Sequence, residues 1–295
     1  MPIPFYIVDV FTQRKYTGNQ LAVLRTGALT DEDMQAIALE THFSETTFIL
    51  SDQAHKGGYD VRIFTPEQEL PFAGHPTLGT AYIIQQQIIG QPVERVTLNL
   101  AVGQIPVTFS YRDGQPDMLW MQQKAPTFGA TLQPERVAPA LKIDVDDIDD
   151  RFPIQVVSTG IAFLMVPLRS RAAVVRATVV KEVLAEVLHQ TRAEGALIFC
   201  PEPYAPENTL NARALFAGLL DSAEDPATGS ANGCLAGYLV KHQYFGEPAI
   251  DIRVEQGYEI KRPSILHLRA HPSSDQIDVH VGGSVVSVAQ GIWGG

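Results

Sequence analysis

The sequence contains few cysteines. Only Cys200 and Cys234 occur among its 295 residues, and neither has a CxxC partner or a histidine at the spacing of a metal ligand. This pattern excludes a disulfide framework and is typical of a protein in a reducing compartment. We therefore expect a cytoplasmic protein.

Long hydrophobic runs and excess positive charge are also missing. The longest apolar stretch, around GIAFLMVPL, has about half of the ~20 residues that a membrane-spanning helix needs. The N-terminus, MPIPFYIVDVFTQRK, does not have the basic and apolar regions of a signal peptide. The formal net charge is −11, and no basic stripe is interleaved with aromatic residues. Nucleic acids and anionic membranes are therefore not expected as partners.

Nucleotide-binding and metal-binding signatures are absent as well. The turns GHPTLG and GSANG lack the GxGxxG spacing, and no GK[ST] follows them. The aspartates of LKIDVDDIDDR, residues 141–151, lack the alternating spacing and the glycine of a calcium loop. We interpret this segment as a solvated connection between two halves of the chain, and we expect no metal and no other cofactor.

One order of elements is present twice. The first half predicts strands at Pro4–Phe11 and Gln20–Leu24, a helix capped by Thr30, two further strands, and a helix that begins at Gly74-His75-Pro76. The second half predicts a helix, two strands, and a further helix that the motif EDPATGSANG opens. Each of the two later helices has an apolar stripe on one face, formed by Leu78, Ala81, Tyr82 and Ile89 and by Ala231, Leu235, Tyr238, Leu239 and His242.

This repeat predicts an α+β protein of two pseudo-symmetric lobes with a cleft between them. We place the lobes at residues 1–124 and 125–282, and a C-terminal strand at about 283–295 is a candidate to complete the first lobe. A small-residue turn opens a helix in each half, Ala73-Gly74-His75 and Thr228-Gly229-Ser230. Unpaired backbone N–H groups at such a helix end attract an anion, although each turn alone is also explained as a simple cap.

Three titratable residues lie at these turns or next to a strand. Glu45 precedes an apolar strand, where it is either a partner in an ion pair or an acid/base whose pKa is raised by burial. His75 is either a structural residue of the helix cap or part of a site. Asp225 is either a turn-forming aspartate or part of a site. The local sequence leaves each pair of interpretations open.

A composite of motifs extends over essentially the whole chain: GNQLAV, SETTF, RIFTPEQELPFAGHPTLGT, EDPATGSANG and EQGYEIKRPS. In these motifs the chain resembles the PhzF family of phenazine-biosynthesis isomerases. The resemblance implies the two-lobed fold of diaminopimelate epimerase, in which curved mixed or antiparallel strands wrap around a central helix in each lobe. It also implies a homodimer that isomerises a dihydro-hydroxyanthranilate, a small anionic metabolite, without a cofactor.

The resemblance further implies roles for individual residues. Glu45 corresponds to the acid/base of the family, with His75 and Asp225 as its catalytic partners. The substrate would be bound by Ser44, Gly74, Gly229 and Ser230. One departure, Leu215-Phe216-Ala217-Gly218, where the family more often has Phe-Ser-Pro, leaves the identity of the substrate open.

Related racemases use two cysteines, one in each helix-opening motif. Ala73 and, in our alignment, Pro226 hold these places here, so two-base thiol chemistry is excluded. Two other interpretations remain open at this point. The chain could be a protein of the same fold that binds a metabolite without converting it, or an isomerase or epimerase of another small carboxylate.

Overall fold

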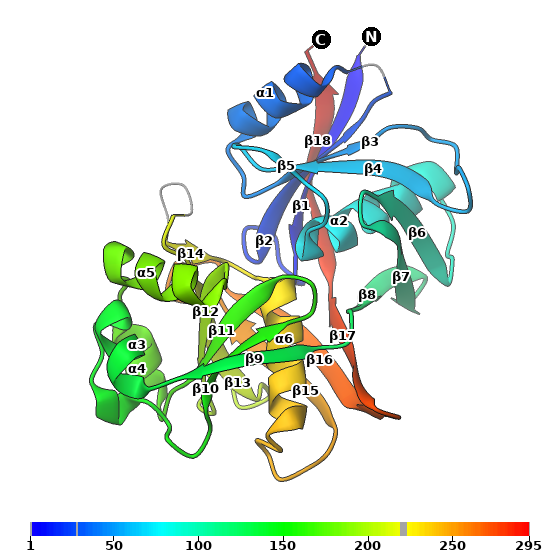
Figure 1. The fold of residues 1–295 in the computed structure, drawn as a ribbon. Helices are drawn as coiled ribbons and strands as arrows, with labels where there is room; N and C mark the ends of the chain where they lie inside the picture. Colours follow the sequence, from blue (N-terminus) through cyan, green and yellow to red (C-terminus); the bar gives the residue numbers. More distant parts are fainter. Residues whose placement is uncertain (1, 28, 219–222, 295) are drawn as a thin grey trace. The chain divides into compact units, whose positions relative to one another are not determined.

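The computed structural model describes residues 2–27, 29–218 and 223–294 (Figure 1). Contacts divide the chain into two compact units. Unit 1 comprises residues 1–121 and 282–295, and unit 2 comprises residues 122–281. In each unit, strands surround one long buried helix.

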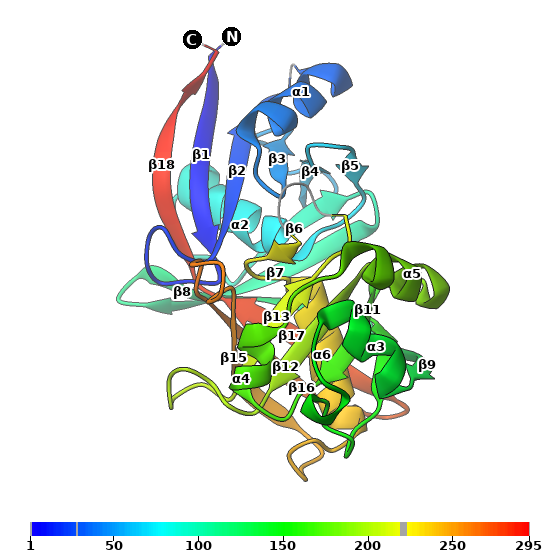
Figure 2. The same ribbon diagram turned by 90° about the vertical axis from the view of Figure 1, so that its left-hand side faces the viewer.

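Unit 1 contains most of the first half of the chain together with its last strand. Its elements are β1 (Ile3–Val10), β2 (Asn19–Arg25), α1 (Asp31–Thr41), β3 (Thr46–Ile49), β4 (Tyr59–Phe64), β5 (Glu69–Leu70), α2 (Gly74–Ile84), the π-helix Gln85–Ile89, β6 (Arg95–Leu100), β7 (Gly103–Arg112), β8 (Gln115–Gln122) and β18 (Val285–Trp293). Strand β1 pairs antiparallel with both β2 and β18, which brings the two ends of the chain side by side (Figure 2).

Unit 2 is continuous in sequence. Its elements are β9 (Thr127–Leu132), α3 (Pro134–Leu141), a short 3₁₀ helix (Val145–Asp147), β10 (Ile154–Ser158), β11 (Ala162–Pro167), α4 (Arg171–Arg176), α5 (Lys181–Thr191), β12 (Gly195–Cys200), β13 (Leu210–Leu215), β14 (Glu224–Asp225), α6 (Gly229–Lys241), β15 (Ile250–Gln256), β16 (Ser264–Ser273) and β17 (Gln276–Gly283). Strand β10 pairs antiparallel with β9 and with β11.

The two units share one connectivity. In unit 1, β2 is parallel to β3, β3 is antiparallel to β4, and β4 is antiparallel to β5 and parallel to β6. Unit 2 repeats this order and these directions with the strands β11 to β15. Strand β11 is parallel to β12, β12 is antiparallel to β13, and β13 is antiparallel to β14 and parallel to β15. The helix that follows the short strand, α2 or α6, contacts the surrounding strands of its own unit. The repeated order of elements in the sequence therefore corresponds to a repeated fold.

Both central helices are buried on nearly every side, which differs from the one-sided stripes that we predict. Every residue of α2 except Tyr82 is buried, and so is every residue of α6 except Lys241. A helix that is enclosed by strands needs apolar or small residues all around. Gly79 illustrates the close packing, because a Cβ atom there would lie 2.6 Å from Leu21 Cδ2. His242 is the C-cap residue and not part of the stripe.

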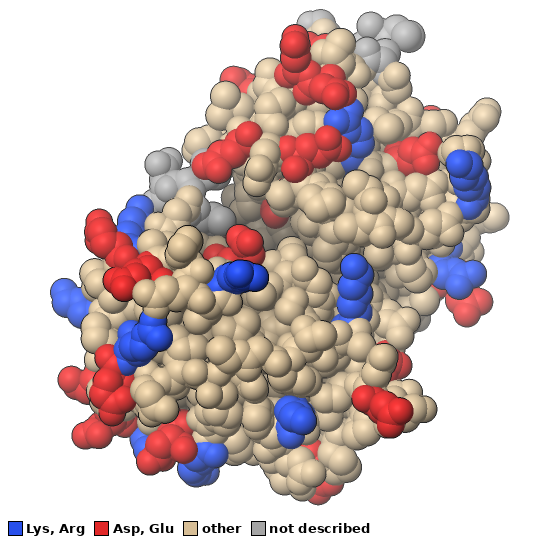
Figure 3. Space-filling view, viewed as in Figure 1, with Lys and Arg blue, Asp and Glu red and all other residues tan. Residues whose placement is uncertain are grey.

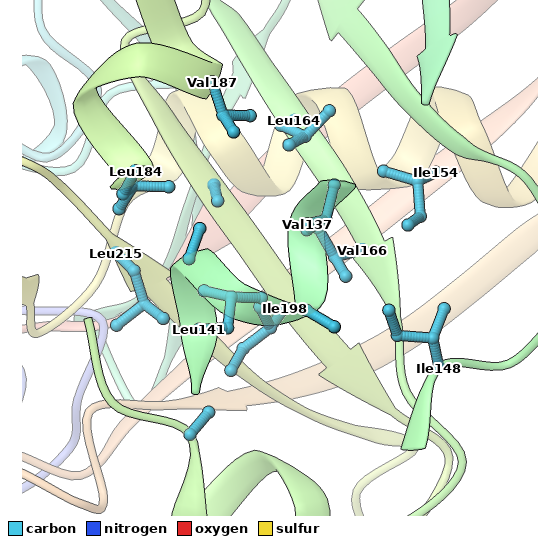
Figure 4. Close-up of a cluster of buried hydrophobic side chains, with 14 of the residues drawn as sticks. Val137, Leu141, Ile148, Ile154, Leu164, Val166, Leu184, Val187, Ile198 and Leu215 are labelled. Carbon is cyan, nitrogen blue, oxygen red and sulfur yellow. The ribbon is translucent and has the colours of Figure 1, made fainter. Parts of the chain in front are cut away.

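Unit 2 has an additional apolar layer outside its strands. Helices α3, α4 and α5 contribute side chains that pack against β10 to β13, and Figure 4 shows this cluster with residues such as Val137, Leu164, Leu184 and Ile198. In unit 1, helix α1 covers a smaller cluster around Met34 and Phe48.

The acidic segment at residues 141–151 is exposed along much of its length, as we predict, but it does not connect the two halves of the chain. It lies within unit 2, and Asp149 is fully buried. Arg151 Nη2 lies 2.7 Å and Arg169 Nη1 3.8 Å from the Asp149 carboxylate. The hydrogen bonds from Arg151 hold the pKa of Asp149 below its usual value. The described residues contain no group of three or more His, Cys, Asp and Glu side chains that could hold a metal ion.

Charged side chains of both signs occur together on one face of the molecule. On the face that Figure 3 shows, Lys and Arg side chains lie singly among Asp and Glu side chains. No helix in the described part of the chain is long and apolar enough to cross a membrane.

Candidate active site

A tight turn between α1 and β3 presents Glu45. The C-cap residue of α1, His42, adopts a left-handed conformation with φ 56°, which turns the chain toward β3. The hydroxyl groups of Thr41 and Thr46 lie 2.7 Å apart and close this turn from both sides. Ser44 and Glu45 lie within the turn, and the Glu45 side chain is 16% exposed. The carboxylate is therefore held at the start of a buried strand.

His75 is the second residue of α2, and its ring contacts two other segments of unit 1. Its Nε2 atom lies 3.5 Å from Glu45 Oε2, and its Nδ1 atom lies 3.3 Å from Asn19 Nδ2. No side chain makes a capping hydrogen bond at this helix end. The histidine thus contacts Glu45 instead of capping the helix. From the sequence we assigned Glu45 and His75 to one site but did not include Asn19. Asn19 nevertheless belongs to GNQLAV, one of the motifs on which the resemblance rests.

Burial keeps the imidazole neutral. The His75 side chain is 5% exposed, and desolvation lowers its pKa to about 3, opposed only in part by a hydrogen bond with the Gln20 backbone. A neutral imidazole has one donor and one acceptor nitrogen. The contact with Glu45 is therefore a pairing of a carboxyl group with a neutral ring, which suits the exchange of a proton better than a fixed ion pair does.

The low pKa of His75 predicts a specific pH dependence of stability. The unfolded chain binds a proton at His75 near pH 6.5 and the folded chain only near pH 3, so the free energy of unfolding should decrease as the pH falls from 6.5. We expect a loss that approaches ~1.4 kcal/mol per pH unit in this window. Urea titrations give the difference in the free energy of unfolding between pH 7 and pH 5. This difference should be smaller for His75→Gln than for the wild type. For His271→Gln, at an exposed histidine, it should equal the wild-type difference. An equal difference in all three proteins would contradict a buried neutral His75.

Unit 2 places the other predicted residues around the start of α6. Gly229 and Ser230 are its first two residues, and both are buried. Asp225 lies in β14 and is also buried, and its Oδ2 atom accepts a 2.6 Å hydrogen bond from Thr228 Oγ1. This contact with a residue three positions later gives Asp225 a structural role in the turn as well. The residues 219–222, which follow the departure at Leu215–Gly218, lie outside the described residues.

The strand registers align the two helix-opening motifs residue by residue. Phe64 pairs with Glu69 in unit 1 as Leu215 pairs with Glu224 in unit 2, so ELPFAGH aligns with EDPATGS. Ala73 and Thr228 are the N-cap residues of α2 and α6. Thr228, and not Pro226, is therefore the equivalent of Ala73 in unit 2, which corrects our sequence alignment at this position. Threonine has no thiol, so the exclusion of paired cysteines is unchanged.

The candidate acid/base carboxylate is not repeated. Thr46 pairs with Phe64 in unit 1, and Ala196 pairs with Leu215 in unit 2. The residues before Thr46 and Ala196, which are Glu45 and Gly195, are therefore equivalent. A side chain at Gly195 would meet the Leu215 carbonyl oxygen at 2.9 Å. The candidate acid/base thus belongs to one unit only.

Both cysteines lie in packed surroundings. Cys200 ends β12, Cys234 lies within α6, and both are free and buried. Burial raises the pKa of each thiol to about 11, so neither is a thiolate near neutral pH.

Replacing both cysteines by alanine should therefore preserve turnover, although lost packing costs ~1–2 kcal/mol at each site. Steady-state kinetics of the double variant tests this prediction, with circular dichroism as the control for folding. A folded double variant without activity would show that a thiol takes part in the reaction.

Comparisons with known proteins agree on one family. The family model described as phenazine biosynthesis-like protein matches residues 8–291. A trans-2,3-dihydro-3-hydroxyanthranilate isomerase of Pseudomonas aeruginosa is 32% identical, and the alignment covers 97% of this chain and 98% of that protein. A crystal structure of a PhzF family protein from Bacillus anthracis is 27% identical, with a TM-score of 0.89 and coverage of 99% of both chains.

A more distant structure shares the fold alone. A probable proline racemase from Agrobacterium radiobacter is 11% identical, with a TM-score of 0.68 and coverage of 98% of this chain and 92% of that one. Together with the repeated connectivity, these similarities confirm the predicted fold class.

Proposed function

Because the chain belongs to the phenazine biosynthesis-like protein family, as its motifs predict, we propose that it moves a proton on a small carboxylate with Glu45 as the acid/base. The family includes proteins named isomerases that align over nearly the whole chain, and this chain is an isomerase. The substrate class and the roles of individual residues are the new part of the proposal.

The contact between Glu45 and His75 carries this proposal. A carboxyl group that is mostly buried, 3.5 Å from a neutral imidazole, can give a proton to one carbon and take a proton from another. His75 can accept or donate a hydrogen bond as the charge on Glu45 changes, because its ring remains neutral. Glu45 protonates a carbon next to an unsaturated or carbonyl group in this mechanism, and His75 assists that transfer.

The remaining residues bind the substrate and stabilise the charge that develops on it. The first N–H groups of α2 and α6 have no carbonyl partner within their helices, and Gly74, Gly229 and Ser230 supply them. Such groups stabilise a carboxylate or a developing enolate oxygen. We assign Ser44 to substrate binding beside Glu45, and Asp225 to orienting a hydroxyl or amino group of the substrate.

The proposed substrate is a carboxylate of the dihydro-hydroxyanthranilate type, because this compound class appears in the name of the Pseudomonas aeruginosa relative. Another small carboxylate is the second candidate, since several relatives are named only as isomerases. We further propose that the protein is a cytoplasmic homodimer and needs no cofactor.

A deuterium-exchange screen tests the proposal. The protein is incubated in heavy water with a panel of unsaturated, hydroxylated and amino carboxylates, and mass spectrometry and NMR detect deuterium at carbon. We expect uptake at one carbon of one compound class, together with a shifted double bond. Tight binding of a panel member without exchange or conversion would instead support the binding-protein interpretation.

A further inference from the structure

A hydrogen-bond network links Asp225 to β15. The side chain of Gln256, the last residue of β15, is fully buried. Its Oε1 atom accepts hydrogen bonds from Thr228 N at 3.3 Å and from Asn232 Nδ2 at 2.8 Å. Its Nε2 atom donates to the Asp225 carbonyl oxygen at 2.9 Å and to Thr228 Oγ1 at 3.2 Å. One amide group thus contacts both the strand and the helix that flank the turn.

Two backbone groups determine the direction of these hydrogen bonds. The Thr228 N–H can only donate and the Asp225 carbonyl can only accept, so the Gln256 amide has one orientation that satisfies both. In that orientation Gln256 Nε2 donates to the Thr228 hydroxyl. The hydroxyl proton of Thr228 is then directed to Asp225 Oδ2, which it reaches at 2.6 Å. The network therefore presents a donor to the Asp225 carboxylate.

The fold itself does not require this network. In unit 2, Ala212 of β13 pairs with Gln256 of β15. The equivalent positions in unit 1 are Val61 in β4 and Leu100 in β6. Asp225 and Thr228 correspond to Leu70 and Ala73. In unit 1 the same backbone arrangement thus forms with Leu70, Ala73 and Leu100, three apolar residues. The polar set in unit 2 is an addition to the fold, at the place where Asp225 has its proposed role.

Neighbouring residues hold Gln256 in place. Glu255, fully buried, accepts hydrogen bonds from Tyr204 N, Ala205 N and Asn208 Nδ2. Gly257 has φ 76°, and a Cβ atom there would lie 2.5 Å from the Pro226 carbonyl oxygen. The motif EQG at residues 255–257 therefore fits closely against the turn that carries Asp225.

We propose that Gln256 and Thr228 are positioning residues, which hold the Asp225 carboxylate as a hydrogen-bond acceptor in the orientation that the reaction needs. Thr228 occupies one oxygen of the carboxylate and limits its rotation, while Gln256 fixes the direction of the Thr228 hydroxyl. This inference rests on the proposed function, because it takes the substrate to be the ligand of Asp225.

The test compares Thr228→Val, which removes the hydroxyl at nearly constant shape, with Thr228→Ser, which keeps it. We expect kcat to fall at least about tenfold for Thr228→Val with KM within about twofold, and Thr228→Ser to recover most of the loss. Gln256→Glu keeps the shape of the side chain, but a carboxylate cannot donate a hydrogen bond to Thr228 Oγ1. We expect a similar fall in kcat for this variant. Thr159→Val is the control, because it removes another buried hydroxyl that contacts α6, at Cys234, but does not contact Asp225.

A second measurement does not depend on activity. In NMR spectra, the side-chain amide signals of Gln256 are assigned by their absence in Gln256→Glu. These signals should shift in Thr228→Val, and their protons should exchange faster with solvent. In Thr228→Ser the signals should return to their wild-type positions. Unchanged amide signals, or wild-type kcat in Thr228→Val while Asp225→Asn is inactive, would overturn the positioning role alone. Wild-type kcat in Asp225→Asn would show that the proposed function assigns Asp225 wrongly, and the positioning role would be overturned with it.

Discussion

Replacement of Glu45 by glutamine is expected to lower kcat by a factor of about 10²–10⁴, the usual contribution of a positioned acid or base. Glutamine is nearly isosteric with glutamate and keeps an acceptor oxygen near His75 Nε2, but it cannot exchange a proton near neutral pH. Binding should therefore be nearly preserved, with substrate affinity within about tenfold, or ~1.4 kcal/mol, of the wild type.

Turnover in heavy water distinguishes a loss of proton transfer from a loss of substrate binding. The wild type should place solvent deuterium at one carbon of the product, and Glu45→Gln should place none, while calorimetric titration still detects binding. Glu40→Gln, at an exposed glutamate of α1, serves as the control and should retain activity. Near-normal turnover in folded Glu45→Gln would remove the central assignment and favour either a His75-centred reaction or a protein that only binds its ligand.

Local sequence was sufficient wherever the determinant of a structure is itself local. Thr30 and Asp33 form a reciprocal capping box at the start of α1, and both residues are visible in the sequence at the required spacing. The helices that begin at Gly74 and Gly229 were also placed correctly, because small residues and a proline precede a long apolar stretch.

Contacts between segments distant in sequence could not be predicted in the same way. Asn19 reaches His75 across 56 residues, and Gln256 reaches Thr228 across 28 residues. Nothing in the residues around either amide specifies its partner, since the contact depends on strand registers. Asp149 combines the two cases, because Arg151 is its near neighbour in the sequence whereas Arg169 is brought beside it by the fold. Long-range pairing thus supplies the part of the site that residue types and spacing leave undefined.

The internal repeat offers a test of how burial changes the contribution of an ion pair. Arg62 and Glu69 in unit 1 align with Arg213 and Glu224 in unit 2, and the closest N···O distances are 2.7 Å and 2.6 Å. The first pair is partly exposed, at 24% and 40%, whereas the second pair is buried, at 11% and 5%. Arg213 Nη1 also donates to the carbonyl oxygens of Val174 and Ala177, both at 2.8 Å.

We expect Arg213→Met to lower the free energy of unfolding by about 3–5 kcal/mol, because Glu224 loses the partner that compensates for its buried charge. Arg62→Met should cost no more than about 1 kcal/mol, since water can solvate Glu69. Urea titrations of both variants at pH 7 provide the comparison. Arg213→Met combined with Glu224→Leu should recover part of the loss, because no charge is then left without its partner. Equal losses in the two single variants would show that the two pairs contribute alike despite their different burial, and would indicate that water reaches Glu224 in solution.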